Sequence, residues 1–434
     1  MAANQEDGNT GLSVIIVGGG IAGLAAATSL AQKHHTVTIL ESAPSLNKFG
    51  ASIGILANGV RPLKAWGLGD AFDKMVTKNR FLEFRNGYTN EYLGHTPHNE
   101  KGFSISNYGE EIWNINRVDY QQVLAQAAEA NGARIVFNAR VESVDVENCV
   151  VECVDGREFK GDVIIGADGN SSVVRGSIPA TKNVKPRPWE EQAFRCTVPK
   201  EKMRGNPELE WLLSVGNEFV WSGEGKYILT WPLPDHRHYD VVCAIQRPSD
   251  VPAGRWGMRA DPEEARKGFE DFCPVMRALL KHIETAVKWT LCDLPPLETC
   301  RSGNGRVVLI GDAFHAMIPH SASGGNSSIE DAACIAECLD WAYRNNKPIS
   351  LATQAFEHLR KPRVERMQEA SRESALKEGT KLFDAALEVP EEERKKAPKP
   401  EKDMHERFPL PGYVQWLWEY DAIEVAREYL ATLG

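Results

Sequence analysis

The chain has 434 residues, of which 42% are hydrophobic and 25% are charged, as expected for a soluble globular protein with two or more substructures. Its net charge of −10 argues against nucleic acid or an anionic membrane as the main partner, because the phosphate groups of these partners bind basic surfaces. Nine cysteines without a CxxC pair predict reduced, buried thiols in the cytoplasm, and eleven histidines without an HExxH or clustered pattern predict no metal site.

The first predicted unit, residues 12–41, is a strand, a glycine turn, a helix and a second strand. Its β-branched run VIIV is typical of a strand buried on both faces, and the GGGIAG that follows is a GxGxxG turn. In such turns Gly18 permits the bend, Gly20 lets a pyrophosphate approach and Gly23 lets the helix pack against the strand. Glu41 ends the second strand, where a carboxylate accepts the ribose hydroxyls of adenosine. The unit predicts FAD or NAD rather than NADP.

A membrane span or signal sequence is the alternative interpretation of this stretch, because no charged residue lies between Asp7 and Lys33. The acidic pair Glu6 and Asp7 stands where a signal peptide has basic residues, and three glycines interrupt the stretch. We therefore expect neither, and no other segment resembles a span.

The segments that follow predict loops, helices and strands in turn along the chain. Residues 50–70 read as a glycine-bearing loop and a short helix, residues 81–107 as extended segments, and residues 117–131 as a helix. Strand-like runs broken by proline and glycine predict a mostly antiparallel sheet over residues 186–294. A helical region is expected from about residue 350 to 385.

Two further segments resemble the first unit in having a strand that ends in a tight turn. GDVIIGADGNSSVVR (residues 161–175) runs into an Asp-Gly turn, with Ser172 and Arg175 placed to begin a helix. RVVLIGDAFHAMIP (residues 306–319) ends in Gly-Asp, where Asp312 can accept hydrogen bonds from a polyol. Taken alone, each segment is compatible with an ordinary strand, turn and helix.

Together, the three segments resemble the GxGxxG, DG and GD fingerprints of the class A flavoprotein monooxygenases, in the family's order and spacing over nearly the whole chain. FEHLRKPRVERMQEASR (residues 356–372) and WLWEYDA (residues 416–422) resemble the salicylate hydroxylase-like branch of the para-hydroxybenzoate hydroxylase family. The resemblance implies an α/β fold with a Rossmann-like FAD-binding domain, an inserted, mostly antiparallel substrate domain and a helical C-terminal region. The implied boundaries are 10–80, 108–185 and 295–345 for FAD, 81–107 and 186–294 for substrate, and 346–434 for the helical region.

Bound FAD is therefore expected, and the resemblance assigns residues to its parts. The ADP half is assigned to Gly18, Gly20, Gly23 and Glu41. The flavin and ribityl chain are assigned to Arg117, Asp312, Pro319, Gly324, Gly325 and Asn326. Asp168, supported by Arg175, is implied in cofactor and NAD(P)H interactions. Because only one GxGxxG is present, we expect NADH or NADPH to dock transiently as the reductant.

In the resembling family, NAD(P)H reduces FAD, O₂ adds to give a flavin C4a-hydroperoxide, and its distal oxygen passes to an electron-rich ring. Such chemistry needs water excluded and a phenol polarised or deprotonated. The catalytic candidates are Arg195, which can hold a phenolate or carboxylate, Tyr227, which can relay a proton, and His320, which can face the pocket. An edge-strand salt bridge and a core tyrosine are equally good interpretations of the first two. Water exclusion is assigned to the aromatic residues Trp211, Phe219, Trp221 and Trp231.

The predicted function is FAD-dependent, NAD(P)H-consuming hydroxylation of a phenolic or hydroxybenzoate-like substrate by O₂, with or without decarboxylation; a homodimer is compatible with the sequence. One alternative is a flavin-dependent epoxidase of an alkene in a specialised metabolite pathway, suggested by GGNSSIEDAA (residues 324–333). A flavin-binding sensor or scaffold without turnover is the alternative from another class.

Overall fold

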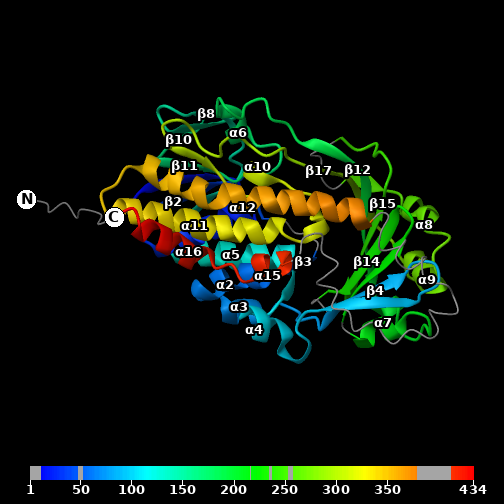
Figure 1. Ribbon diagram of the computed structural model, residues 1–434. Coiled ribbons are helices and arrows are strands. Elements are labelled where there is room, and N and C mark those ends of the chain that lie inside the picture. Colours follow the sequence, from blue (N-terminus) through cyan, green and yellow to red (C-terminus); the bar gives the residue numbers. More distant parts are fainter. Residues whose placement is uncertain (1–10, 47–51, 216, 234–236, 253–257, 379–411) are drawn as a thin grey trace, which may run out of the picture.

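The computed structural model describes residues 11–46, 52–215, 217–233, 237–252, 258–378 and 412–434. A parallel sheet with its helices forms one end of the molecule, and a large mixed sheet forms the other (Figure 1). Helices α11 (Gly324–Arg344) and α12 (Ile349–Glu378) run side by side from the first end toward the second (Figure 1). The two helices thus extend from the parallel sheet to the large sheet.

The parallel sheet has the strand order β18-β11-β1-β2-β7. Its strands are short β-branched runs with buried side chains, as expected when helices cover both faces. They are β1 (Ser13–Val17), β2 (Thr36–Leu40), β7 (Arg134–Val136), β11 (Val163–Gly166) and β18 (Val307–Leu309). Helices α1 (Ile21–Gln32) and α5 (Arg117–Ala130) pack beside them with α11. The predicted strand, turn, helix and strand at the start of the chain, and the helix over residues 117–131, are confirmed.

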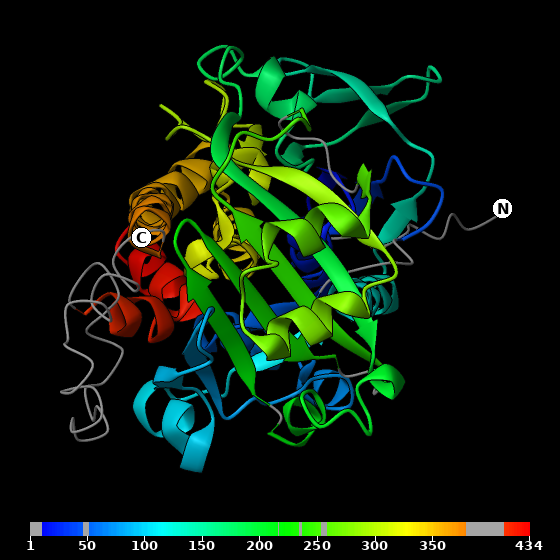
Figure 2. The ribbon, with the colours of Figure 1, turned by 90° about the vertical axis from the view of Figure 1, so that its right-hand side faces the viewer.

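The second sheet has eight strands in the order β16-β17-β12-β15-β14-β13-β4-β5. All neighbouring pairs are antiparallel except β13 with β4. The strands are β4 (Phe81–Asn86), β5 (Tyr92–Pro97), β12 (Arg187–Pro199), β13 (Glu218–Gly223), β14 (Lys226–Pro232), β15 (His238–Ile245), β16 (Met258–Ala260) and β17 (Ala286–Asp293). Helices α7 (Glu210–Val215), α8 (Pro262–Gly268) and α9 (Pro274–Lys281) belong to this end, and Figure 2 shows α8 and α9 over the outer face. The antiparallel prediction for residues 186–294 is confirmed.

One local prediction is wrong. Residues 81–107 were expected to be extended throughout, but their last part folds into a 3₁₀ turn, Glu100–Gly102, and helix α4 (Phe103–Tyr108). Gly102 and Gly109, at φ +75° and +77°, bound this short helix. Glycine on both sides lets the chain enter and leave the helix in left-handed turns, which the residue composition alone did not reveal.

The remaining strands and helices are short. β3 (Ser52–Ile55) pairs with β6 (Trp113–Asn116), and β8 (Val141–Asp145), β9 (Val150–Cys153) and β10 (Glu158–Lys160) form a three-stranded sheet. The short helices are α2 (Ala57–Ala65), α3 (Gly69–Asp73), α6 (Val173–Ser177), α10 (Asp312–His315), and 3₁₀ turns at Lys200–Lys202 and Pro319–Ser321. After α12, the chain has α15 (Tyr413–Trp418) and α16 (Ala422–Ala431); residues 379–411 of the predicted helical region lie outside the described residues.

A buried ionic cluster joins α11 to α12. Arg360 donates to Asp331 at 2.8 Å and forms an ion pair with Glu330 at 2.6 Å, and all three side chains are 0% exposed. Arg363, one turn further along α12, pairs with Glu330 at 2.7 Å. Asp331 also accepts hydrogen bonds from the backbone of Gly311, at 2.9 Å, and thus holds the GD turn.

The cluster keeps both of its acids ionised. Burial alone raises the pKa of Asp331, but the charges of His315 and Arg360 outweigh it and lower that pKa from 3.8 to about 2. Glu330 likewise has a lowered pKa, because Arg363 and Arg360 outweigh its burial. A carboxyl with a depressed folded-state pKa stabilises the fold above its ordinary pKa. The contribution of Asp331 is therefore complete above about pH 4 and is lost as the pH falls toward 2.

All nine cysteines are buried and free, as the sequence predicted. Among the described residues, no group of three or more His, Cys, Asp or Glu side chains is arranged to hold a metal ion. None of the described helices is both long and apolar enough to cross a membrane.

Substituting Arg360 tests the cluster. Arg360→Leu removes the buried cation that contacts both Glu330 and Asp331 and leaves Glu330 with Arg363 and Asp331 with His315, and we expect it to lower the free energy of unfolding in urea by about 3–5 kcal/mol. The matched control is Arg344→Leu, since Arg344 pairs with Asp340 but its side chain is 62% exposed, and solvent-exposed pairs contribute little. Equal effects of the two substitutions would contradict the role of the cluster.

Candidate functional site

The glycine turn after β1 forms an open cradle at the start of α1. Gly18 has φ +108°, and a Cβ there would lie 2.4 Å from the carbonyl oxygen of Ala167. A Cβ on Gly23 would lie 2.0 Å from the carbonyl oxygen of Gly18, whereas one on Gly20 would project into open space. The helix has no side-chain cap, so its first N–H groups can bind an anion. Glu41 stands beside the turn and accepts a hydrogen bond from Gly19 N at 2.8 Å.

The DG and GD turns lie next to one another at the ends of β11 and β18. The carboxylate of Asp168 caps α6, accepting from Ser172 Oγ at 2.5 Å, and burial raises its pKa. Arg175 donates to the carbonyl oxygens of Ala313, at 3.0 Å, and Asn170, at 2.6 Å. The DG residues thus brace the GD helix, and neither Asp168 nor Arg175 lines the cavity described next.

A cavity of about 460 Å³ lies between the GD segment and the eight-stranded sheet. This volume is within the usual range for a small-molecule site. Its wall includes most of the residues that the resemblance assigned to the flavin, namely Arg117, Asp312, Pro319, Gly324 and Gly325. Asn326 is outside the wall, because its buried amide accepts from Leu56 N and donates to Ala322 O. The C-terminal helix α15 closes one side with Tyr413, Val414, Leu417 and Trp418.

The inner face of the eight-stranded sheet provides the floor of this cavity, in three cross-strand rows. Side chains alternate between the two faces, so residues two apart on one strand belong to adjacent rows. The first row contains Thr96, Leu82, Glu218, Trp231 and Asp240. The second contains Phe84, Val220, Leu229, Val242 and Arg195. The third contains Tyr227, Ala244, Ala193 and Trp289.

Arg195 lies in the cavity wall but is already paired. Its Nη2 donates to Asp240 Oδ2 at 2.5 Å and to the carbonyl oxygen of Ser52 at 2.9 Å. The guanidinium carbon also lies 5.5 Å from the centre of the Trp231 ring. Asp240 is 1% exposed and neutralises the arginine, so this pair is a fixed hydrogen-bonding group and not a free cation.

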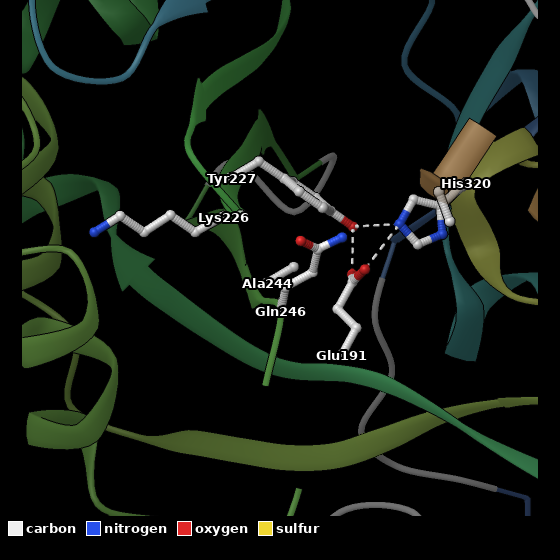
Figure 3. Close-up of a pocket in the computed structure, with 8 residues that line it drawn as sticks. Glu191, Lys226, Tyr227, Ala244, Gln246 and His320 are labelled. Atoms are coloured by element: carbon white, nitrogen blue, oxygen red, sulfur yellow. Dashed lines mark hydrogen bonds and ion pairs between the residues drawn. The ribbon is translucent and has the colours of Figure 1, made fainter. Parts of the chain in front are cut away.

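Tyr227 and His320 meet a third residue, Glu191, at the third row of the floor (Figure 3). The hydroxyl of Tyr227 donates to Glu191 Oε1 at 3.2 Å and lies 3.5 Å from His320 Nε2. Glu191 Oε2 lies 3.3 Å from the same nitrogen, and the side chains of His320 and Glu191 are 1% and 4% exposed. Behind the three residues is a second pocket of about 10 Å³, room for about one water molecule.

The comparisons with known proteins agree with this arrangement. The chain matches the family model described as the FAD binding domain over residues 11–371. It belongs to the family of FAD-dependent monooxygenases. It is 28% identical to the FAD-dependent monooxygenase OpS4 of Beauveria bassiana (strain ARSEF 2860), over 97% of this chain and 98% of that protein. It is 29% identical to a salicylate hydroxylase of Pseudomonas putida, over 99% and 97%. The crystal structure of CtdE in complex with FAD and substrate 4 has the same fold, with a TM-score of 0.82 at 22% identity over 97% and 98% of the chains.

FAD is the cofactor of this monooxygenase, and NAD(P)H is the usual reductant of its family. The residues present fit the cofactor. The open space at Gly20 and the uncapped start of α1 suit a pyrophosphate, and Glu41 stands where an adenosine ribose would bind. Asp312 and Arg117 line the cavity wall, where their polar groups would be available to hold the ribityl chain and flavin.

One group of sequence assignments to the monooxygenase site is wrong. Trp211, Phe219 and Trp221 were expected to keep water from the reacting centre, but they belong to the core on the opposite face of the sheet. Of the four aromatic residues named for this purpose, only Trp231 lines the cavity, where Trp289 accompanies it. A run rich in aromatic residues does not by itself show which side chains point inward.

The sequence interpretation of the monooxygenase missed two partners of the named residues, Glu191 and Asp240. Glu191 had a detectable signal, since it lies four residues before Arg195 on β12 and period-two alternation puts both on one face. Asp240 had no such signal, because its contact with Arg195 depends on the pairing of β12 with β15.

Glycine substitutions separate cofactor binding by the monooxygenase from folding. Gly20→Val adds a side chain in open space, so we expect a folded protein that loses at least ten-fold in FAD affinity. Gly23→Ala forces a contact with the Gly18 carbonyl, and we expect it to lose both FAD and stability. The matched control is Gly303→Val, because Gly303 is exposed and a side chain there also meets open space; this variant should retain bound FAD. Flavin absorbance and thermal unfolding would measure both properties; full FAD content in Gly20→Val would refute the assignment.

Proposed function

We propose that this monooxygenase hydroxylates a phenolic aromatic substrate in the cavity above the three-row floor. The observation that carries the proposal is the contact of Tyr227 with the buried side chains of Glu191 and His320, in which a phenolic hydroxyl, a carboxylate and an imidazole lie within 3.5 Å of one another. A phenol must lose its proton, at least in part, before its ring can accept an electrophilic oxygen. The three residues provide groups that can take this proton.

Bound FAD, once reduced by NAD(P)H, supplies an oxygen atom from O₂. The protein's own part is to hold the substrate and move its proton. With the phenol next to Tyr227, the tyrosine oxygen accepts the substrate proton while its own proton passes to Glu191 or to His320 Nε2. The small pocket behind them offers a place for one water to carry the proton onward.

Arg195 is poorly placed to bind a carboxylate group of a substrate. Its charge is already balanced by Asp240, so a substrate anion would gain less there than at an unpaired arginine. Its contacts with Asp240 and Trp231 also place the guanidinium at the first row, away from Tyr227 in the third. Hydroxylation without a ring carboxylate is therefore the form of the reaction that the site favours.

The reaction itself is testable with the purified holoenzyme. We expect substituted phenols to stimulate NAD(P)H oxidation and to gain one ¹⁸O atom from labelled O₂, as measured by mass spectrometry of the product. A panel of isolated alkenes is the comparison, since epoxidation needs no proton acceptor. If alkenes gain the label and phenols do not, the protein is an epoxidase and the proposal fails.

Tyr227→Phe tests the proton path. We expect turnover at neutral pH to fall by about 10²-fold with FAD content unchanged, because the first proton acceptor is lost. The rate should recover as the pH rises toward the pKa of a free phenol, about 10, because the substrate then ionises without help. Steady-state kinetics over this pH range would measure both effects.

The matched control for that variant is Tyr92→Phe. Tyr92 also contacts a histidine, His95, but it lies on β5 with 41% exposure and does not line the cavity. The control should behave as the parent protein. A Tyr227→Phe variant with a parental pH profile would exclude the proposed path.

A further inference from the structure

The first row of the cavity floor is a second polar site, which the proposed proton path does not use. Glu218 lines the cavity, and its Oε1 accepts a hydrogen bond from Asn79 at 3.0 Å. Phe219 pairs with Thr230, which puts the preceding Glu218 beside Trp231 on the next strand. Nε1 of Trp231 is buried and has no hydrogen-bond partner among the described residues. The row therefore places a carboxyl group and a tryptophan whose buried N–H is unpaired on neighbouring strands of the cavity wall.

An apolar band separates this row from Tyr227. Val220, Leu229 and Val242, from three neighbouring strands, line the cavity between the two polar rows. Tyr227 and Trp231 are four residues apart on β14, which corresponds to about 13 Å along the strand. A phenol with a single ring cannot reach both rows, whereas two rings, or one ring with an extended substituent, can.

The charges in the first row also restrict the far end of a ligand. Glu218 and Asp240 are both acidic, and no described basic side chain other than Arg195 is paired with either of them. Burial raises the pKa of Glu218 above its ordinary value, against the effect of its hydrogen bond from Asn79. A carboxylate would find no free cation here, because Arg195 is already paired, while a hydroxyl or amide can both accept from an N–H group and bond to a carboxyl group.

We propose that the substrate is an extended aromatic compound with two polar ends. Its phenol faces Tyr227, its middle packs on the apolar band, and its far end carries an uncharged hydroxyl or amide group that binds Glu218 and Trp231. The orientation of the phenol rests on the proposed function; the far-end site itself does not.

Binding to the oxidised holoenzyme tests this proposal without turnover. The probes are three biphenyl phenols that differ only on the far ring, which carries a carboxamide, a methyl group or a carboxylate. Changes in the visible absorbance of bound FAD report the dissociation constants. We expect the carboxamide to bind at least ten-fold more tightly than the methyl compound, and the carboxylate to bind most weakly. Equal binding of carboxamide and methyl compounds, or tightest binding of the carboxylate, would overturn the proposal.

Variants then locate the interaction. Glu218→Leu and Trp231→Phe should each reduce the preference for the carboxamide over the methyl compound to less than three-fold, while Glu218→Gln, which keeps a hydrogen-bonding group, should retain most of it. Trp211→Phe is the matched control, because Nε1 of Trp211 donates to the carbonyl oxygen of Glu208 on the other side of the sheet. An unchanged preference in both Glu218→Leu and Trp231→Phe would refute the site. Selective binding without hydroxylation of any phenol would instead refute the proposed function alone.

Discussion

The arrangement of the site depends on two adjacent acidic residues of α11 that are buried in their ionised form. Glu330 and Asp331 are tolerated there because Arg360 and Arg363, three residues apart on α12, meet them at hydrogen-bonding distance. Asp331 also holds Gly311 and so fixes where the GD turn ends, while Arg363 donates to backbone carbonyls of α15, which closes the cavity. One ionic cluster thereby positions two walls of the site that are about a hundred residues apart in the sequence.

The strands of the large sheet form part of the hydrophobic core on one face and the floor of the cavity on the other. Alternation of side chains gives its outer face an apolar core, which includes Phe219 and Trp221 under helices α8 and α9, and its inner face a cavity floor (Figure 2). On the inner face, the first row carries Glu218 and Asp240, the third row carries Tyr227, and mainly apolar residues lie between them. The proposed chemistry and the proposed specificity thus come from different rows of the same surface.

The sequence was most informative where a function needs residues close together in the chain. The GxGxxG turn, the helix after it and Glu41 are local, and Asp312 follows soon after its strand, so the glycine cradle, the acid beside it and the turn at Asp312 were predictable. Three aromatic residues were wrongly assigned to the cavity, because a segment rich in tryptophan and phenylalanine predicts strands but does not show which face of the sheet each side chain is on. The cluster around Asp331 escaped notice for a related reason, since its arginines lie about thirty residues away on another helix.

What the sequence determined by itself was the α/β class and a dinucleotide site, because turns, buried strands and helix starts are set by short-range sterics and hydrogen bonding. The choice of FAD and of monooxygenase chemistry came from the resemblance of three segments to the fingerprints of one family. The tertiary structure alone decided which residues act as partners. Glu191 reaches Tyr227 and His320, and Asp240 reaches Arg195, through strand register and the approach of the GD segment to the sheet. Such contacts between distant segments arise only when both sheets have packed around the cavity, and no local pattern encodes them.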